Sequence, residues 1–278
     1  MLIVCVYETP LHVVDPKNPG AVDEIIHLGD YWDVEKMEAN KEVILEGIER
    51  NGKFYRRAYK YLAAAKLIKD DIAWKVEEAL EIGQVNVAIY NLISDIFENA
   101  WISPTTGKDR HLFGSAYTPT GWHEYTDTLL EDFNKTYYIT GEIGTGKSKL
   151  LEKVYNEAII RGIDVEVYHT PLVPEKIETV IIKELNIGLT TSKLATMFNA
   201  EEINLDQYID QGKLEVYKED IEEDKKIFLD LVAIASKEFA KAKKNHDGIE
   251  ESYVPNMDFE AIEEVRKEII SRMLSYEK

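Results

Sequence analysis

The chain has 278 residues, of which 45% are hydrophobic and 31% are charged. This is the composition of a globular protein large enough for one or two domains with a buried core. The formal net charge is −19, and so acidic a protein repels phosphate backbones, which argues against a nucleic-acid partner. No segment approaches the roughly 18 uninterrupted apolar residues of a membrane span, so we expect no membrane association.

The N-terminal part of the chain is predicted to be mostly helical. Residues 2–7 form a short apolar run that is typical of a buried strand. No basic leader precedes them, so a signal peptide is not expected. The single cysteine, Cys5, cannot form an internal disulfide, and we therefore expect a cytoplasmic protein. After a break at 15–20, apolar residues recur at helical spacing from about 22 to 99.

Strands and helices alternate over the middle of the chain, after a linker that contains Pro104 and Gly107. The predicted segments are a strand over 111–117, a turn at 118–121, a helix over 122–133, a strand over 135–140, a helix that ends near Gly162, a strand over 164–168 and one or two strands over 179–191. From about 202 the pattern is helical again. This alternation predicts an α/β fold with a mostly parallel sheet of the P-loop NTPase type, flanked by helical segments.

An internal repeat organises these segments. Residues 24–72 align with 201–249 at an offset of 177 without a gap, and about 18 of the 49 positions are identical. A gapless run at one offset favours a duplication over shared helical composition, which would scatter matches over many offsets. We therefore divide the chain into a partial first repeat over 1–107, a nucleotide-binding module over 108–200 and the helical segment of the second repeat over 201–278.

The two copies are unequal, because the first has no loop region ahead of its helical part. Only residues 1–20 stand where the second copy has strands and a glycine-rich loop. A strand over 1–8 without its neighbours would expose an unpaired edge. We expect that Met1 is an internal start and that a second glycine-rich loop is encoded upstream, at the spacing that the second copy shows. The alternatives are pairing with the surviving sheet or completion by another polypeptide.

The strongest chemical motif is the sequence GEIGTGKS at 141–148, which matches G-x-x-x-x-G-K-[ST] between a predicted strand and a predicted helix. Its glycines permit backbone torsions that direct successive N–H groups at a phosphate, and the helix that follows points its positive end at the same anion. The residues expected to bind the nucleotide are Gly141, Glu142, Ile143, Gly144, Thr145, Gly146, Lys147 and Ser148.

Two side chains of this loop are predicted to perform the chemistry. The Lys147 ammonium would bridge the β- and γ-phosphates, and the Ser148 hydroxyl would ligate Mg²⁺. The metal commonly has a second support, an acid at the end of an apolar strand. Glu184 ends the run Val-Ile-Ile-Lys-Glu and is our candidate for this metal-binding and catalytic role, the alternative being an ordinary exposed glutamate.

Two further pairs of residues stand beside predicted strands. His169 and Thr170 end a strand, on the edge where open α/β sheets bind ligands. Arg110 and His111 precede the 118–121 turn and are candidates for contacting a base or a phosphate. For each pair the alternative is a purely structural role at the end of a strand.

The chain resembles a family beyond the glycine-rich loop. The motifs that carry the resemblance are HVVDPKNPGAVDEII at 12–26, RHLFGSAYTPTG at 110–121, VEVYHTP at 165–171, VIIKEL at 180–185 and NMDF at 256–259. Together they resemble the tandem P-loop ATPases, or nucleotide-kinase-related proteins, of spore-forming and related bacteria. The resemblance implies ATP binding in a cytosolic protein but no settled reaction, and this chain departs from the family by lacking the first P-loop module.

We therefore expect an ATP-binding protein with Mg²⁺ as its cofactor and slow or partner-stimulated hydrolysis. One alternative is a small-molecule or nucleotide kinase, in which His169 or Arg110 would help to bind the phosphoryl acceptor. The other alternative is a non-catalytic, nucleotide-responsive scaffold that acts on a protein partner. ATP turnover screened against candidate acceptors would separate the three.

Overall fold

The structure, a computed structural model, describes residues 16–276. The strand predicted over 2–7, with Cys5, lies outside the described residues. The chain forms two compact units: a smaller one from Met1–Gly52 with Lys244–Lys278, and a larger one from Lys53–Lys243.

These units do not follow the three segments 1–107, 108–200 and 201–278 that the sequence predicts. The long helices α2 (Lys41–Glu78) and α7 (Lys218–Tyr253) come from the two outer segments, and each contributes residues to both units. Ala58 of α2 forms one buried cluster with Ala235 and Phe239 of α7, so parts of both outer segments belong to the larger unit.

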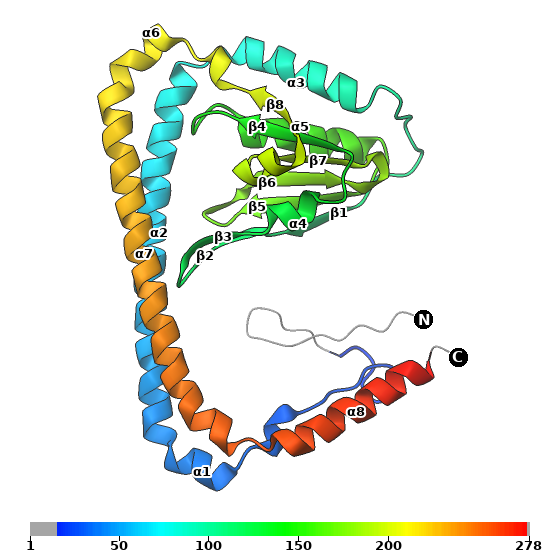
Figure 1. Ribbon diagram of the computed structural model, residues 1–278, viewed down its shortest axis with the longest axis vertical. Coiled ribbons are helices and arrows are strands. Elements are labelled where there is room, and N and C mark those ends of the chain that lie inside the picture. The colour runs from blue at the N-terminus through cyan, green and yellow to red at the C-terminus, as the bar shows by residue number, and fades with distance from the viewer. Residues whose placement is uncertain (1–15, 277–278) are drawn as a thin grey trace. The chain divides into compact units, whose positions relative to one another are not determined.

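The larger unit contains a six-stranded sheet in the order β1-β5-β6-β7-β4-β8 (Figure 1). Every neighbouring pair is parallel except the pairs that β6 makes with β5 and β7. The fold is therefore α/β with a mostly parallel, mixed sheet. Its strands are β1 (Asp109–Leu112), β4 (Lys135–Thr140), β5 (Val165–Thr170), β6 (Val173–Ile182), β7 (Ile187–Thr190) and β8 (Glu201–Asn204).

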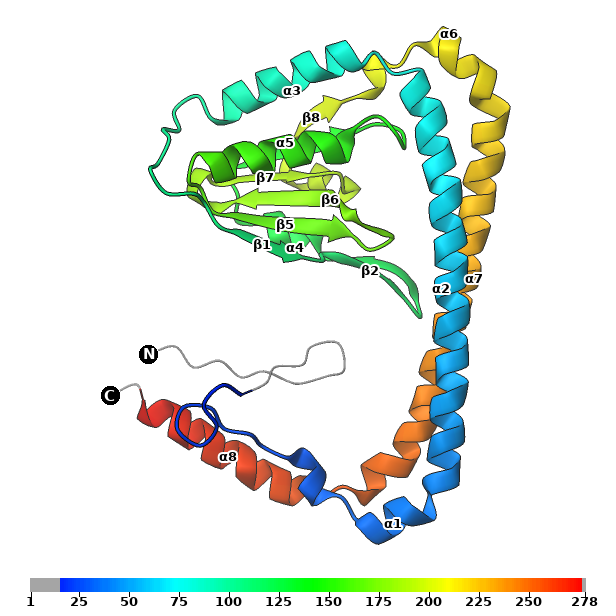
Figure 2. The same cartoon turned by 180° about the vertical axis from the view of Figure 1, so that it is seen from behind.

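Helices cover both faces of this sheet. Helices α3 (Ile82–Ile96) and α5 (Lys147–Ile160) pack on one face, where their apolar stripes form the main core with β4, β5, β6 and β7. The short helix α4 (Thr126–Leu130) packs on the other face through the fully buried Leu130. Figures 1 and 2 show α4 and α5 in front of the sheet in opposite views.

The local structure differs from prediction at three places. The strand predicted over 111–117 divides at Gly114 into β1 and β2 (Ser115–Thr118). Residues predicted to begin a helix instead form β3 (Gly121–Glu124), which pairs antiparallel with β2. Residues 201–204 form β8 rather than a helix, because they pair with β4 at the edge of the sheet. In each case pairing with a neighbouring strand outweighs local propensity.

The internal repeat reappears as equivalent backbone contacts in the two units. In the larger unit Asp210 N donates to Ala79 O and Glu81 N donates to Tyr208 O, at 2.8 and 2.9 Å. In the smaller unit Asp33 N donates to Asn256 O and Asp258 N donates to Tyr31 O, at the same two distances. Each of these residues is 177 positions from its counterpart. We call the two sets of contacts the 79–81/208–210 junction and the 31–33/256–258 junction.

The remaining helices follow the same offset. Helix α1 (Val34–Ala39) precedes α2 as α6 (Gln211–Leu214) precedes α7, and Asp33 and Asp210 cap their first turns with side-chain oxygens. Helix α8 (Phe259–Ser275) follows α7 as α3 follows α2. Within residues 16–276, no helix combines the length and the apolar character needed to cross a membrane.

Candidate functional site

The loop at 141–146 joins β4 to α5 and depends on three glycines with left-handed backbone torsions. The φ angles are 141° at Gly141, 99° at Gly144 and 90° at Gly146. Side chains rarely adopt these angles, so the G-x-x-G-x-G spacing is what allows the chain to turn from strand to helix here. Leu150 N donates to Gly146 O at 2.9 Å, so α5 begins directly after the last glycine.

The floor of the loop is closed by Thr145, which is fully buried. Its hydroxyl donates to Glu142 O at 2.9 Å. A Cβ at Gly141 would stand only 2.6 Å from that hydroxyl oxygen, so no larger residue fits there. The loop is therefore a closed turn. The first four N–H groups of α5 have no acceptor within the helix, and they face the concave side of the loop.

Lys147 folds back over this concave side. Its ammonium donates to Gly141 O and to Glu142 O, the latter at 2.7 Å. Burial lowers the pKa of Lys147 to about 8, and the neighbouring Asp206 carboxylate opposes that change. An ammonium held only by carbonyl oxygens in a partly dry loop would gain energy from an anion at the same place.

Ser148 connects the start of α5 to the middle of β6. Its Oγ accepts a hydrogen bond from Ile177 N at 2.7 Å. One lone pair and the hydroxyl proton remain for another partner. The contact also fixes which part of the sheet lies next to Ser148: residues 176–178 of β6.

Asp206 holds the other side of the loop. It follows β8, whose strand is parallel to β4 and ends at the same edge of the sheet. Its Oδ1 accepts a hydrogen bond from Glu142 N at 2.7 Å. A carboxylate therefore secures the first turn of the loop, opposite the Ser148 side.

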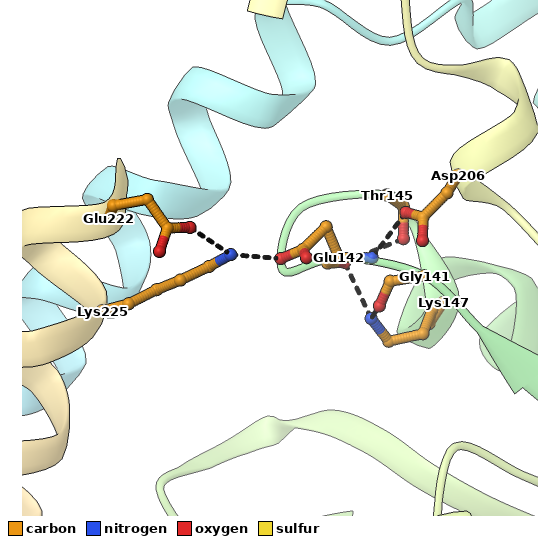
Figure 3. Close-up of polar contacts among 7 residues, drawn as sticks. All are labelled: Gly141, Glu142, Thr145, Lys147, Asp206, Glu222 and Lys225. Carbon is orange, nitrogen blue, oxygen red and sulfur yellow. Dashed lines mark hydrogen bonds and ion pairs between the residues drawn. The ribbon is translucent and has the colours of Figure 1, made fainter. Parts of the chain in front are cut away.

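Both long helices contact the loop (Figure 3). Glu142 forms an ion pair with Lys225 of α7 at 3.1 Å, and Lys225 also contacts Glu222 at 3.2 Å. On the other side, a Cβ at Gly144 would stand 2.5 Å from the Ala73 carbonyl oxygen of α2. The negative residue that the sequence places in the loop is thus directed outward to a lysine.

The prediction for Glu184 is wrong. Glu184 lies between β6 and β7, where Ile182 pairs with Ile187. Ile187 in turn pairs with Lys135, the first residue of β4, whereas the loop follows the last residue of β4. The six residues of β4 separate the two ends of the sheet by about 20 Å. Because β6 runs antiparallel to β5 and β7, its last residues lead Glu184 to the edge of the sheet opposite Ser148.

A different carboxylate stands next in sequence to the residue that contacts Ser148. Glu178 of β6 follows Ile177, the partner of Ser148, and its side chain is buried. Its Oε2 accepts a hydrogen bond from Ser115 Oγ at 2.6 Å. Burial raises the pKa of Glu178, and the nearby Glu124 carboxylate raises it further. Within the described residues Glu178 has no ion pair, so a cation beside it would be stabilising.

The two candidate histidines meet at the outer edge of the sheet. His111 Nδ1 and His169 Nε2 are 2.7 Å apart, and His111 Nε2 is 3.3 Å from Asp109 Oδ2. Tyr155 of α5 donates its hydroxyl proton to the same Asp109 oxygen. This hydrogen bond lowers the pKa of Asp109 and raises that of Tyr155 to about 12. The result is a hydrogen-bonded chain of four side chains, separated from the loop by the width of β6 and β7.

The other two candidates do not join this chain. Arg110 alternates with His111 along β1 and lies 3.8 Å from Glu166, with its side chain 70% exposed. Thr170 donates its hydroxyl proton to Val173 O at 3.0 Å and so closes the turn between β5 and β6. Arg110 is therefore an exposed residue of β1, and the contact of Thr170 lies within its own turn.

Four residues beside the loop escaped the sequence-based reasoning: Lys69 of α2, Glu178, Asp206 and Lys225. Asp206 and Lys225 lie 64 and 83 positions after Glu142 in sequence, and no motif connects them with the loop. The repeat offers one usable signal. Asp206 aligns with Gly29 and Lys69 with His246, although the positions around them are often identical. A charged residue that departs from its counterpart in a repeat is a candidate for function.

Comparison of the chain with protein-family models, with curated proteins and with solved structures gives no match in any of the three searches.

Proposed function

We propose that the chain is a P-loop NTPase-type protein that binds Mg²⁺-ATP at residues 141–148. The observation that supports this proposal is the conformation of the loop itself. Three glycines with positive φ turn β4 into α5, and among the described residues the Lys147 ammonium has only carbonyl oxygens of the same loop as hydrogen-bond partners. A triphosphate would replace those carbonyls with charged oxygens and receive the free N–H groups of α5.

Two side chains are suited to hold Mg²⁺ beside the nucleotide. Ser148 Oγ keeps one free lone pair, and Glu178 is a buried carboxylate without an ion pair among the described residues. In this proposal Glu178 takes the place that the sequence assigns to Glu184. When bound, the metal would neutralise charge on the β- and γ-phosphates, while Lys147 orients them.

A second candidate function is supported by the contacts of the loop with both long helices. Glu142 pairs with Lys225 of α7, and Gly144 lies against Ala73 of α2. A change in the loop on nucleotide binding would act directly on these helices. The chain would then be a nucleotide-responsive scaffold with little turnover, rather than an efficient hydrolase or a kinase.

Replacement of Ser148 by alanine tests the metal assignment. We expect Ser148→Ala to weaken ATP binding in the presence of Mg²⁺ more than in EDTA, because the hydroxyl contributes only through the metal. Isothermal titration calorimetry under both conditions measures this difference. An equal loss under both conditions would show that Ser148 merely links α5 to Ile177.

Phosphate release separates the hydrolase from the scaffold. The purified chain is incubated with Mg²⁺-ATP, alone and with candidate small-molecule acceptors. Slow release that Glu178→Gln abolishes supports hydrolysis, a rate that rises with one added acceptor supports a kinase, and binding without release supports the scaffold.

A further inference from the structure

The γ-phosphate end of the proposed nucleotide can be located from Ser148. In P-loop proteins the metal held by this serine bridges the β- and γ-phosphate oxygens. Ser148 contacts Ile177, so the γ-phosphate end would face residues 176–178 in the middle of β6. The opposite side of the loop, at Asp206 and β8, is then the side of the α-phosphate and the nucleoside.

Helix α2 packs against the loop at Ile143 and Gly144. A Cβ at Gly144 would stand 2.5 Å from Ala73 O, 2.9 Å from Ala73 Cα and 3.0 Å from Val76 Cβ. Ile143 packs against the buried Ile72 and Val76 of the same helix. The face of α2 that contains residues 73 and 76 is therefore the face that touches the loop.

Lys69 lies one turn before Ala73 on this face, because residues four apart in a helix are stacked on one side. Its side chain is partly buried, and within the described residues it has no ion pair and no hydrogen bond. The other two lysines of this part of α2 differ from it. Lys66 pairs with Asp70 at 2.6 Å, and Lys75 pairs with Asp224 at 2.6 Å.

The electrostatic surroundings of Lys69 agree with its position. Burial lowers the pKa of Lys69, the Lys176 ammonium lowers it further, and Glu178 opposes both. Lys69 and Lys176 both lower the pKa of Lys147 as well. The charges of Lys69 and Lys176 thus act at Lys147, and those of Lys176 and Glu178 act at Lys69. Cations gathered around a partly buried space are stabilised by a polyanion.

We propose that Lys69 is a further phosphate-binding residue, which reaches from the long helix α2 to the γ-phosphate of ATP. This inference rests on the proposed function and adds to the loop a phosphate-binding residue from helix α2. Because ADP lacks the γ-phosphate, Lys69 distinguishes ATP from ADP and makes the contact between α2 and the loop depend on the nucleotide.

The test compares Lys69→Gln with wild type in the full chain, with Lys66→Gln as the control. Lys66 is on the same helix, one turn away, and its removal takes the same charge from α2. Affinities for Mg²⁺-ATP and Mg²⁺-ADP are measured separately by calorimetry. We expect Lys69→Gln to weaken ATP binding about tenfold, the loss of one charge-assisted contact, and to change ADP binding less than about twofold. Lys66→Gln should change neither, and Lys69→Arg should restore most of the ATP affinity.

The melting temperature separates a phosphate-binding role of Lys69 from a structural role, because the loss of a structural residue would lower it. An unpaired, partly buried lysine does not stabilise the fold, so Lys69→Gln should melt at the wild-type temperature or above. Equal losses for ATP and ADP, or a lowered melting temperature, would make Lys69 a structural residue and overturn the inference. Unchanged ATP affinity in Lys69→Gln would overturn it while leaving the proposed function standing. Absence of ATP binding by the wild type would overturn both.

Discussion

The 79–81/208–210 junction and the 31–33/256–258 junction have the same backbone hydrogen bonds but different surroundings. In the larger unit, the helix that leaves the junction, α3, buries Val85, Ile89, Leu92 and Ile96 against the sheet core. The counterparts on α8 are Ile262, Arg266, Ile269 and Met273, and none of them is buried. Within residues 16–276, the same backbone contacts thus occur once beside a packed sheet and once without one, and the difference lies in what the side chains contact.

The comparison also separates scaffold residues from site residues. Asp33 and Asp210 are identical and cap equivalent helices. Asp206, which holds the loop, aligns with Gly29 in the first copy, and Lys69 aligns with His246. Helix capping and junction contacts are thus common to both copies, whereas each of these two charges occurs in only one copy, Lys69 in the first and Asp206 in the second. Residues that are identical in the two copies therefore build the fold, and charged residues that differ between the copies lie at the site.

The largest expected effect comes from breaking the packed face of α3. Ile89 is 2% exposed in the main core, and its counterpart Arg266 is exposed on α8. Ile89→Ala should lower the free energy of unfolding of the larger unit by about 3 kcal/mol, because it leaves a cavity. Arg266→Ala should produce no measurable change. Thermal unfolding followed by circular dichroism measures both, and equal effects would contradict the distinction between the two helices.

Replacement of each of two glycines by alanine tests the contact between the loop and α2. Gly144→Ala would place a Cβ 2.5 Å from Ala73 O, whereas Gly121, with a φ of 108°, has nothing within 4 Å of the same position. Both substitutions strain the backbone by about 1 kcal/mol, and only Gly144→Ala adds the collision. We expect a loss of about 2 kcal/mol for Gly144→Ala and a weaker ATP affinity. Chemical denaturation of both variants decides this, and indistinguishable midpoints would place α2 away from the loop.

The sequence predicts some parts of this arrangement and not others. The loop and the strand and helix that flank it follow from local pattern, because glycine spacing and apolar periodicity act within a few residues. The direction of β6 does not, since Val180, Ile181 and Ile182 are all apolar and polar residues flank this run at both ends. The sequence therefore predicts Glu184 at the wrong edge of the sheet. The contact of His111 with His169 depends on β1 pairing with β5, which no local pattern specifies.

The smallest expected effect concerns pH. Burial lowers the pKa of His169, and the neighbouring His111 lowers it further. Between the ordinary histidine pKa and the lowered pKa of His169, the unfolded chain therefore binds a proton at this residue and the folded chain does not. The free energy of unfolding falls as pH drops through this range. We expect His169→Gln to lose less stability than wild type between pH 7 and pH 5. Urea denaturation at each pH measures the slopes, with the exposed His123→Gln as the control. Equal slopes for wild type and His169→Gln would show that His169 is not the source.

The most direct test of the central claim is the titration of Mg²⁺-ATP into wild type and Lys147→Ala by calorimetry. Lys153→Ala, which removes the same charge from α5 two turns further on, serves as the control. The loop predicts at least a tenfold loss of ATP affinity in Lys147→Ala, about 1.4 kcal/mol, with an unchanged melting temperature, because the lysine binds the phosphate rather than the fold. Lys153→Ala should bind ATP as wild type does. Equal ATP affinity in wild type and Lys147→Ala would contradict nucleotide binding at residues 141–148.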